Sequence, residues 1–189
     1  MKIPAVITTE RLGLRQWEPR DRPVFAALNA DPKVMEFFPA VLSRAASDST
    51  ADRMALKIAD RGWGFWAVEI KATHEFIGFV GLNDPDGLPF SPCVEVGWRL
   101  ARAHWGQGYA AEAAKAALKV AFESLAIDEV VAFTAAGNAR SRRVMEKLRM
   151  EPIPVTFEHP AVPVGNPLRT HVLYRLTSDA WKRELAVAG

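Results

Sequence analysis

A short glycine-rich run, Trp105-Gly106-Gln107-Gly108-Tyr109-Ala110, stands directly before a stretch with the apolar spacing of an amphipathic helix. Glycine lets the backbone approach a ligand closely, and the first N–H groups of a helix have no partner within the helix. A helix N-terminus also stabilises negative charge. We call this run the glycine turn. Its residues predict either a diphosphate site or simply a tight turn.

A second segment with polar groups at a helix start follows downstream, where residues 138–148 have helical spacing. Asn138 suits a helix N-cap, and Ser141, one turn later, shares the inward face of the helix with Val144 and Leu148. The Ser141 hydroxyl could donate a proton to a leaving group, or Ser141 could be a small packing residue.

Glu95 is a candidate base in the strand predicted over residues 94–100, where it lies on the face opposite the apolar side chains. A carboxylate in a narrow apolar cleft has a raised pKa and can accept a proton from an amine. An ion-paired surface glutamate would fit the same pattern, so both interpretations stay open.

Strands and helices must position these groups. We expect strands over residues 12–17, 63–70, 76–82, 94–100, 129–134, 153–158 and 171–176, and helices from residue 19 and over 47–59, 108–125, 138–148 and 179–186. The many alanines of the 108–125 helix indicate close packing on a sheet. The order of elements predicts one α/β (α+β) domain over residues 1–189, with a mixed sheet whose parallel part lies in the middle.

Composition narrows the function classes. The 189 residues include 24 Lys and Arg against 22 Asp and Glu, so the chain lacks the basic excess of a nucleic-acid binder. Cys93 is the only cysteine and the four histidines are dispersed, so we expect no intramolecular disulfide and no metal site. No apolar run is long enough for a membrane span or a signal peptide, which predicts a cytoplasmic protein.

The glycine turn can be compared with two well-known phosphate-binding motifs. A Walker loop has four residues between its glycines and then Gly-Lys-Ser/Thr, which this sequence lacks. The letters G-x-G-x-x-A of a Rossmann turn do occur, but five residues separate Leu100 from Gly106. Asp128 and Glu129, at the distance expected for the ribose-binding acid, begin the next strand instead of ending it. A dinucleotide site therefore fits poorly.

A third family fits better. The strand over residues 94–100 followed by the glycine turn resembles the acetyl-CoA-binding signature of the GNAT superfamily, and more narrowly its ribosomal-protein N-terminal acetyltransferase (RimJ/RimL-like) branch. The resemblance extends over nearly the whole chain. Thr9-Glu10-Arg11-Leu12 opens like that branch, the Asn138/Ser141 helix is similar to its second cofactor helix, and His171-Val172-Leu173-Tyr174 resembles its closing strand.

Three positions depart from the family pattern. Trp105 stands where Gln or Arg is frequent, which the branch tolerates because backbone amides bind the ligand. Arg149-Met150 replaces a frequent Gly-Phe. Met145 stands where many relatives have a tyrosine general acid, so that role does not transfer to this chain.

The resemblance implies a GNAT fold of about six to seven mostly antiparallel strands, with helices on both faces and a splayed central parallel pair. It also implies that acetyl-CoA is the cosubstrate, that no metal takes part, and that a primary amine attacks directly through a tetrahedral intermediate. Glu95 would be the base and Ser141 the proton donor to the thiolate. The implied donor site comprises Trp98, Arg99, Leu100, Trp105, Gly106, Gln107, Gly108, Tyr109, Ala110, Asn138 and Ser141. Arg140, Arg142 and Arg143 either approach the 3′-phosphate or form a solvated basic face.

The acceptor site is less defined. Its walls could include Phe37, Phe38, Trp63, Phe65, Trp66, His159 and His171, although core packing would also explain these residues; His104 adjoins the glycine turn. A polyamine or aminoglycoside would require several carboxylates, and residues 37–60 offer only Asp48, Asp52 and Asp60. We therefore expect a small amine or a protein N-terminus as acceptor, and a monomer or homodimer. The alternatives are a non-catalytic CoA-binding regulatory module and, with less support, a dinucleotide-binding oxidoreductase.

Overall fold

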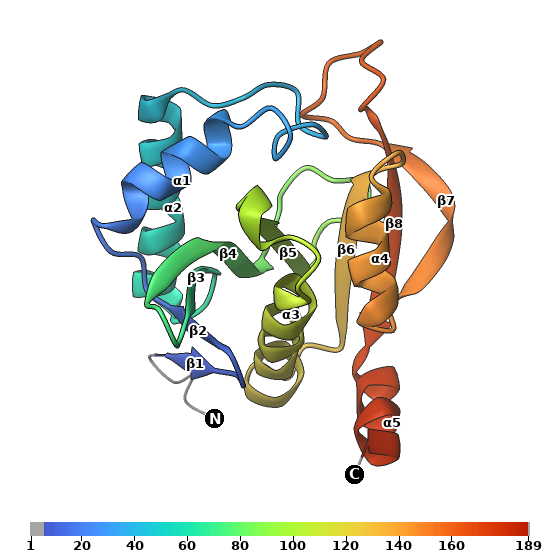
Figure 1. Cartoon of the computed structure of the whole chain (residues 1–189). Helices are drawn as coiled ribbons and strands as arrows, with labels where there is room; N and C mark the ends of the chain where they lie inside the picture. The colour runs from blue at the N-terminus through green and yellow to red at the C-terminus, as the bar shows by residue number, and fades with distance from the viewer. Residues whose placement is uncertain (1–5, 189) are drawn as a thin grey trace.

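The computed structural model describes residues 6–188 and contains an eight-stranded sheet with the order β1-β2-β3-β4-β5-β6-β8-β7 (Figure 1). The first half of the chain forms β1 (Ile7–Thr8), β2 (Leu12–Arg15), α1 (Asp21–Ala30), α2 (Arg44–Arg61), β3 (Phe65–Ile70), β4 (Glu75–Asn83) and β5 (Glu95–Leu100). The second half forms η1 (Arg102–His104), α3 (Tyr109–Lys119), η2 (Val120–Ser124), β6 (Glu129–Ala135), α4 (Ala139–Lys147), β7 (Glu151–Glu158), β8 (Thr170–Thr177) and α5 (Ser178–Ala188).

The predicted fold class is confirmed, with differences at element ends. The additional strand is β1, whose two residues are too few to produce an alternating pattern. The helix over 47–59 is longer than expected, because Ser43 caps it at Arg44 and left-handed Gly62 (φ 81°) ends it after Arg61. The helix over 108–125 is regular only to Lys119. It then continues as one π-helical turn, closed by the Leu125 N–H on the Val120 carbonyl at 3.0 Å.

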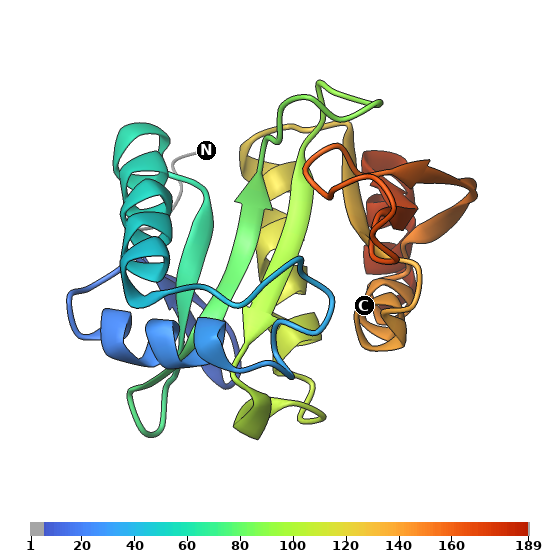
Figure 2. The ribbon, with the colours of Figure 1, turned by 90° about the horizontal axis from the view of Figure 1, so that it is seen from above.

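Helices cover both faces of the first half of the sheet. Figures 1 and 2 show α1 and α2 on one face and α3 on the other. The α3 side that packs on the sheet consists mainly of alanine: Ala113, Ala114 and Ala117 are fully buried. Small side chains let the helix backbone lie close to β4 and β5, which confirms the packing that the alanine-rich sequence predicted and places the N-terminus of α3 near the end of β5.

The centre of the sheet contains one parallel pair of strands, β5 and β6, and these two strands diverge from each other. Strands β5 and β6 are in register only at Glu95 and Val131, where the Val131 N–H donates to the Val94 carbonyl at 2.8 Å. Beyond this point no ladder joins the two strands within residues 6–188. The predicted splayed pair is therefore present, and it leaves one edge of β5 without a strand partner.

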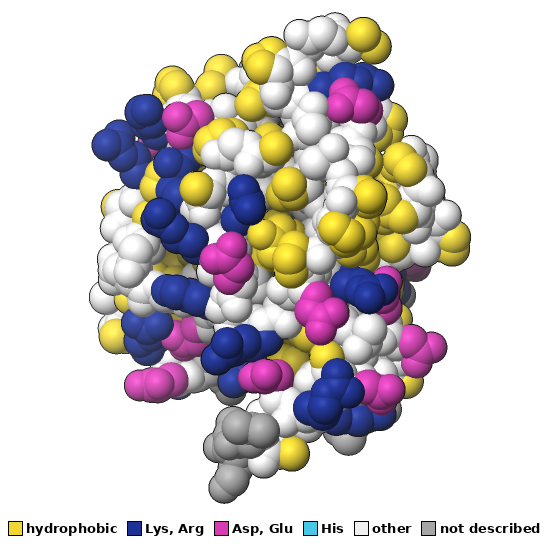
Figure 3. Space-filling model, turned by 90° about the vertical axis from the view of Figure 1, so that its right-hand side faces the viewer, with side chains coloured by type: hydrophobic (Ala, Val, Ile, Leu, Met, Phe, Trp, Pro, Cys, Tyr) yellow, Lys and Arg dark blue, Asp and Glu magenta, His cyan; other side chains and the backbone are white. Residues whose placement is uncertain are grey.

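Strand β7 lies at the outer edge of the sheet and is largely exposed. Its Pro152 and Pro154 lack backbone N–H donors, and its register with β8 shifts between Pro152 and Thr156. Figure 3 views this side of the molecule, where hydrophobic side chains gather between charged ones; Val155 on β7 is 63% exposed. The prolines limit the pairing of this edge with another strand. No helix among residues 6–188 is long and apolar enough to cross a membrane.

Candidate functional site

A cavity of about 780 Å³ opens where β5 and β6 diverge. Its walls come mainly from residues 34–39, β5, the glycine turn, the first turn of α3, one side of α4 along its length, residues 133–134 of β6 and residues 159–162. This volume lies within the range of small-molecule and cofactor sites. The diverging strands thus create a space that an intact central ladder would close.

The glycine turn forms one end of the cavity. Gly106 and Gly108 both have left-handed backbones, with φ of 77° and 84°. A Cβ added at Gly106 would meet no atom within 4 Å, so the backbone faces open space. No side chain of the described residues caps α3, and the N–H groups of its first turn keep their donor capacity. The arrangement suits an anionic group.

Arg11 fastens the glycine turn to the start of the sheet. Its Nε donates to Glu112 Oε2 at 2.7 Å, its Nη1 donates to the Gln107 carbonyl at 3.0 Å, and its Cζ lies 4.6 Å from the Tyr109 ring centroid. Glu112 also accepts from the Thr9 hydroxyl. Sequence reasoning missed this brace, although the Thr9-Glu10-Arg11 opening was the available signal.

Most of the expected donor-site residues meet at this cavity. It is lined by Trp98, Arg99, Leu100, Trp105, Gly106, Gly108, Tyr109, Ala110, Asn138 and Ser141. Gln107 is not among the lining residues. The Trp105 indole N–H donates to the Leu100 carbonyl at 2.8 Å, so this carbonyl already has a partner. The available edge of β5 is therefore the part before Leu100.

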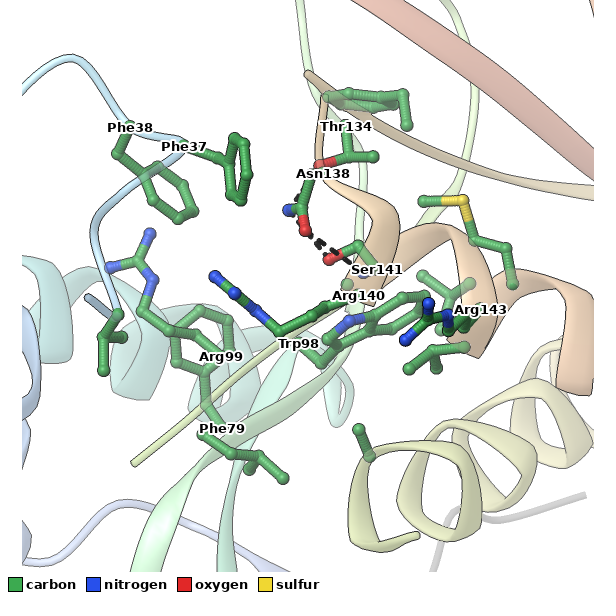
Figure 4. Close-up of a pocket in the computed structure, with 18 of the residues that line it drawn as sticks. Phe37, Phe38, Phe79, Trp98, Arg99, Thr134, Asn138, Arg140, Ser141 and Arg143 are labelled. Atoms are coloured by element: carbon green, nitrogen blue, oxygen red, sulfur yellow. Dashed lines mark hydrogen bonds between the residues drawn. The ribbon is translucent and has the colours of Figure 1, made fainter. Parts of the chain in front are cut away.

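Asn138 and Ser141 form a local hydrogen-bond network at the start of α4 (Figure 4). Asn138 Oδ1 accepts from the Ser141 N–H at 3.2 Å, which confirms the predicted N-cap. Its Nδ2 donates to Ser141 Oγ at 3.1 Å and to Thr134 Oγ1 at 2.9 Å. Because Ser141 Oγ accepts here, its own proton can be donated elsewhere. Met145, on the same helix, is buried at 1% exposure and lines the cavity without an acidic group.

The basic residues of α4 divide into two groups. Arg140 and Arg143 line the cavity, whereas Arg142 turns away and donates to the Tyr174 hydroxyl at 3.3 Å. Arg140 pairs with Glu36 at 2.7 Å and lies 4.5 Å from the Trp105 ring centroid. This ion pair joins α4 to the loop after α1 and holds the pKa of Glu36 below its usual value.

Glu95 occupies the closed end of the splayed pair and is the only carboxylate among the described residues that line the cavity. Burial raises the pKa of Glu95 to about 7, although the Asn83 amide donates to its Oε2 at 3.3 Å. The side chain packs tightly, since a Cβ added at Gly97 would lie 3.3 Å from Glu95 Oε1. Near neutral pH such a carboxylate can both bind and release a proton.

The aspartates of α2 do not line the cavity. Asp48 pairs with Arg44 at 2.8 Å, and Asp52 pairs with Arg22. Asp60, like these two, does not line the cavity. The cavity therefore lacks the group of carboxylates that a polycationic ligand would require.

Two histidines stand on the wall opposite β5. The rings of His159 and His171 are 4.8 Å apart, and both line the cavity. Burial lowers the pKa of each, so both are mainly neutral at pH 7. The Nδ1 of His171 lies 3.0 Å from the Arg169 carbonyl, which assigns the proton to Nδ1 and leaves Nε2 as an acceptor. His104 also lines the cavity, and its Nε2 lies 3.2 Å from Glu75 Oε1.

Only some of the aromatic residues that we named as possible walls of the acceptor site line the cavity. Phe37, Phe38 and Phe65 line the cavity. Trp66 is buried at 2% exposure in the core, and Trp63 stacks against Arg61 with 3.5 Å between the guanidinium carbon and the ring centroid. Trp66 is therefore a core residue, and Trp63 makes a cation–π contact with Arg61 instead of lining the cavity.

The side chain of Arg99 is a feature that sequence reasoning missed, since only its backbone was considered. Nη1 donates to Asn29 Oδ1 at 2.7 Å. Cζ lies 4.1 Å from the Phe38 ring centroid, and Figure 4 shows these two side chains next to each other. Nε is buried without a hydrogen-bond partner among the described residues. Burial lowers the pKa of Arg99 to about 10. The available signal was a charged residue in a strand with apolar neighbours.

A cluster that could hold a metal ion does not occur within residues 6–188: no three His, Cys, Asp or Glu side chains converge there.

Comparisons with known proteins agree with this geometry. The uncharacterised protein YkkB of Bacillus subtilis is 32% identical over 151 residues, covering 79% of this chain and 87% of its own. The FsC-acetyl coenzyme A-N(2)-transacetylase of Aspergillus fumigatus is 27% identical over 194 residues, covering 97% of this chain and 80% of its own. RimL, a ribosomal L7/L12 alpha-N-protein acetyltransferase solved with coenzyme A, shares the fold at a TM-score of 0.73 and 16% identity, covering 93% of this chain and 99% of its own.

The family model of the acetyltransferase (GNAT) domain matches residues 11–151, which include the glycine turn, β5 and the Asn138/Ser141 helix start. This chain therefore belongs to the GNAT acetyltransferase family.

Proposed function

We propose that this protein transfers the acetyl group of acetyl-CoA to a primary amine, either a small amine or a protein N-terminus. The observation that carries the proposal is that the splayed β5–β6 pair joins the glycine turn to Glu95 within one cavity. The names of two similar proteins support the donor: one is a transacetylase that uses acetyl coenzyme A, and the other was solved with coenzyme A.

The residues at the open end of the cavity fit CoA. The outward amides of the glycine turn suit a diphosphate, and the open space above Gly106 leaves room for it. The unpaired edge of β5 offers backbone groups to the amides of a pantetheine arm. Arg143 and Lys147 line the same cavity and would balance phosphate charge. Bound acetyl-CoA supplies an activated thioester.

Glu95 and Ser141 have the properties that the proton transfers require. An amine must lose a proton to become a nucleophile, and the carboxylate of Glu95, with a pKa of about 7, can accept it directly or through water. Ser141, whose Oγ already accepts from Asn138, can donate its proton to a departing thiolate. A backbone N–H of β5 directed at the thioester oxygen would contribute about 3–4 kcal/mol, by analogy with other oxyanion sites.

The proposal is tested by measuring CoA release from acetyl-CoA with a panel of amines, together with acetyl-CoA binding by calorimetry. Turnover with at least one amine is the expected result. Tight CoA binding without turnover would indicate the non-catalytic CoA-binding module instead. Thermal stabilisation by a nicotinamide dinucleotide but not by CoA would indicate the oxidoreductase. A cytoplasmic location and a monomeric or homodimeric state stay predictions from the sequence.

A further inference from the structure

The cavity has a second half, on the other side of β5 from α3. Residues 95, 97 and 99 lie on one face of β5. On this face Arg99 contacts Asn29 of α1 and Phe38 of the loop that follows α1. Phe65 and Phe79 form the apolar wall between them, with ring centroids 5.0 Å apart. This half is separate from the glycine turn, so it is the part available to an acceptor.

Arg99 gives this half a positive charge, and no acid within residues 6–188 forms an ion pair with it. Its only hydrogen-bond partner among the described residues is the neutral amide of Asn29. Asn29 is itself held by the Ser47 hydroxyl at 2.9 Å, and both residues are fully buried. A buried guanidinium is costly unless an anion balances it. The surrounding network therefore orients a cation but leaves its charge available.

The other charged residue on this face of β5 is Glu95, four residues earlier in the strand. Four strand residues span about 13 Å between α-carbons, and both side chains can reach into that interval. Glu95 Oε1 already lies over Gly97, between the two positions. A ligand with a basic group at one end and an acidic group at the other would complement this arrangement.

We propose that the acceptor is an amine that also carries a carboxylate, bound by Arg99 through the carboxylate with its amine beside Glu95. This inference rests on the proposed acetyl transfer and names its substrate class. The phenylalanine wall would contact an apolar body between the two groups. A polyamine or aminoglycoside would place additional cations near Arg99 and meet a single carboxylate at Glu95, so electrostatic repulsion excludes this class.

The test compares acceptors that differ only in the carboxylate: 6-aminohexanoate with 6-aminohexanamide, and the dipeptide Gly-Phe with its C-terminal amide. Their dissociation constants are measured by calorimetry with and without saturating CoA. For wild-type protein the acid of at least one pair binds about tenfold more tightly than its amide, because an ion pair with hydrogen bonds replaces a neutral contact.

Variants assign that preference to Arg99. Arg99→Gln removes the preference, and Arg99→Lys keeps part of it. Asn29→Asp also reduces it, because a carboxylate beside Nη1 would neutralise the guanidinium while keeping Arg99 in place. Arg53→Gln, which removes an exposed arginine from α2, is the matched control and leaves the preference unchanged. Thermal melting establishes that each variant is folded.

Three outcomes would overturn the proposal. The first is amides that bind as tightly as their acids, and the second is acids that do not bind below about 10 mM. The third is weaker CoA binding by Arg99→Gln while the preference for acids over amides persists. That result would place Arg99 in the CoA site. Failure of the wild-type protein to bind CoA would contradict the proposed function instead, and the measurements without CoA would still test Arg99.

Discussion

The two halves of the cavity are built differently. The half proposed to bind acetyl-CoA, here the donor half, offers mainly backbone N–H groups from one short run of chain, the glycine turn, which Arg11 holds in place. The half proposed to bind the amine, here the acceptor half, consists of side chains from separate elements: Asn29 on α1, Phe38 on the following loop, and Glu95 and Arg99 on β5. Backbone N–H groups do not depend on residue type, whereas side chains do, so the donor half depends on the path of the chain and the acceptor half on the residues that stand at particular positions.

The strongest test of this contrast is Glu95→Gln, which changes only the acceptor half. Removing a general base lowers kcat/KM by about 100-fold. The effect is largest between about pH 7 and the pKa of the substrate amine, where the amine arrives protonated and Glu95 is ionised, and the dissociation constant of acetyl-CoA stays unchanged. Glu151→Gln, at an exposed position on β7, is the control. Activity that is unchanged at every pH would remove Glu95 from the mechanism.

The donor half is tested by Gly106→Ala, with Gly165→Ala as its match. Both glycines have a left-handed backbone, with φ of 77° and 84°, and a Cβ at either meets no atom within 4 Å. The local strain is therefore similar, about 1 kcal/mol in each variant. Only Gly106→Ala should weaken acetyl-CoA binding, by about tenfold, because it displaces the amides that hold the diphosphate. Equal binding by the two variants would show that the glycine turn is only a turn.

Ser141 lies between the two halves of the cavity. We expect Ser141→Ala to have a smaller effect on activity than Glu95→Gln. A thiolate is a good leaving group without help, so loss of the Ser141 proton lowers kcat by about fivefold. Acetyl-CoA affinity changes little, because Asn138 still has Thr134 as a partner. Ser49→Ala on the exposed side of α2 is the comparison variant. A decrease confined to acetyl-CoA affinity would make Ser141 a packing residue of the donor half.

The smallest expected effect is on stability. The pKa of Glu95 is about 7 in the folded protein, against an ordinary value of 4.5. Between these values the folded state binds more protons than the unfolded state, so the free energy of unfolding of the wild type decreases as pH rises through this window. Glu95→Gln removes this contribution to the pH dependence of the free energy of unfolding. The variant should gain melting temperature relative to wild type at pH 8 and show little difference at pH 4; a difference independent of pH would contradict the raised pKa.

Local patterns predicted much of the fold and part of the site. Two runs rich in aromatic and β-branched residues predicted strands β3 and β4, and the run of alanines predicted the close packing of α3. The Asn138 cap was readable because its partner, the Ser141 N–H, lies three residues away. Such features depend on neighbours in sequence, which is why one chain suffices to predict them.

Contacts between segments that are distant in sequence could not be predicted from the sequence. The Arg11–Glu112 pair joins residues 101 positions apart, and the Arg99–Asn29 pair joins residues 70 positions apart. The two residues of β1 gave no periodic signal of their own. No spacing rule relates such residues, because only the packing of helices on the sheet brings them together.

The sequence by itself therefore determined the α/β fold and the position of the glycine turn, since these follow from short-range patterns and backbone chemistry. The family was indicated by a resemblance to the GNAT superfamily, which the family model confirmed. Only the tertiary structure located the separation of β5 and β6 after Glu95, and only it decided that this carboxylate is buried enough to have a pKa near 7 and that the Arg99 charge remains available. The physical reason is that burial, and with it the cost of a charge, is a property of the surrounding elements and not of a residue's own sequence neighbours.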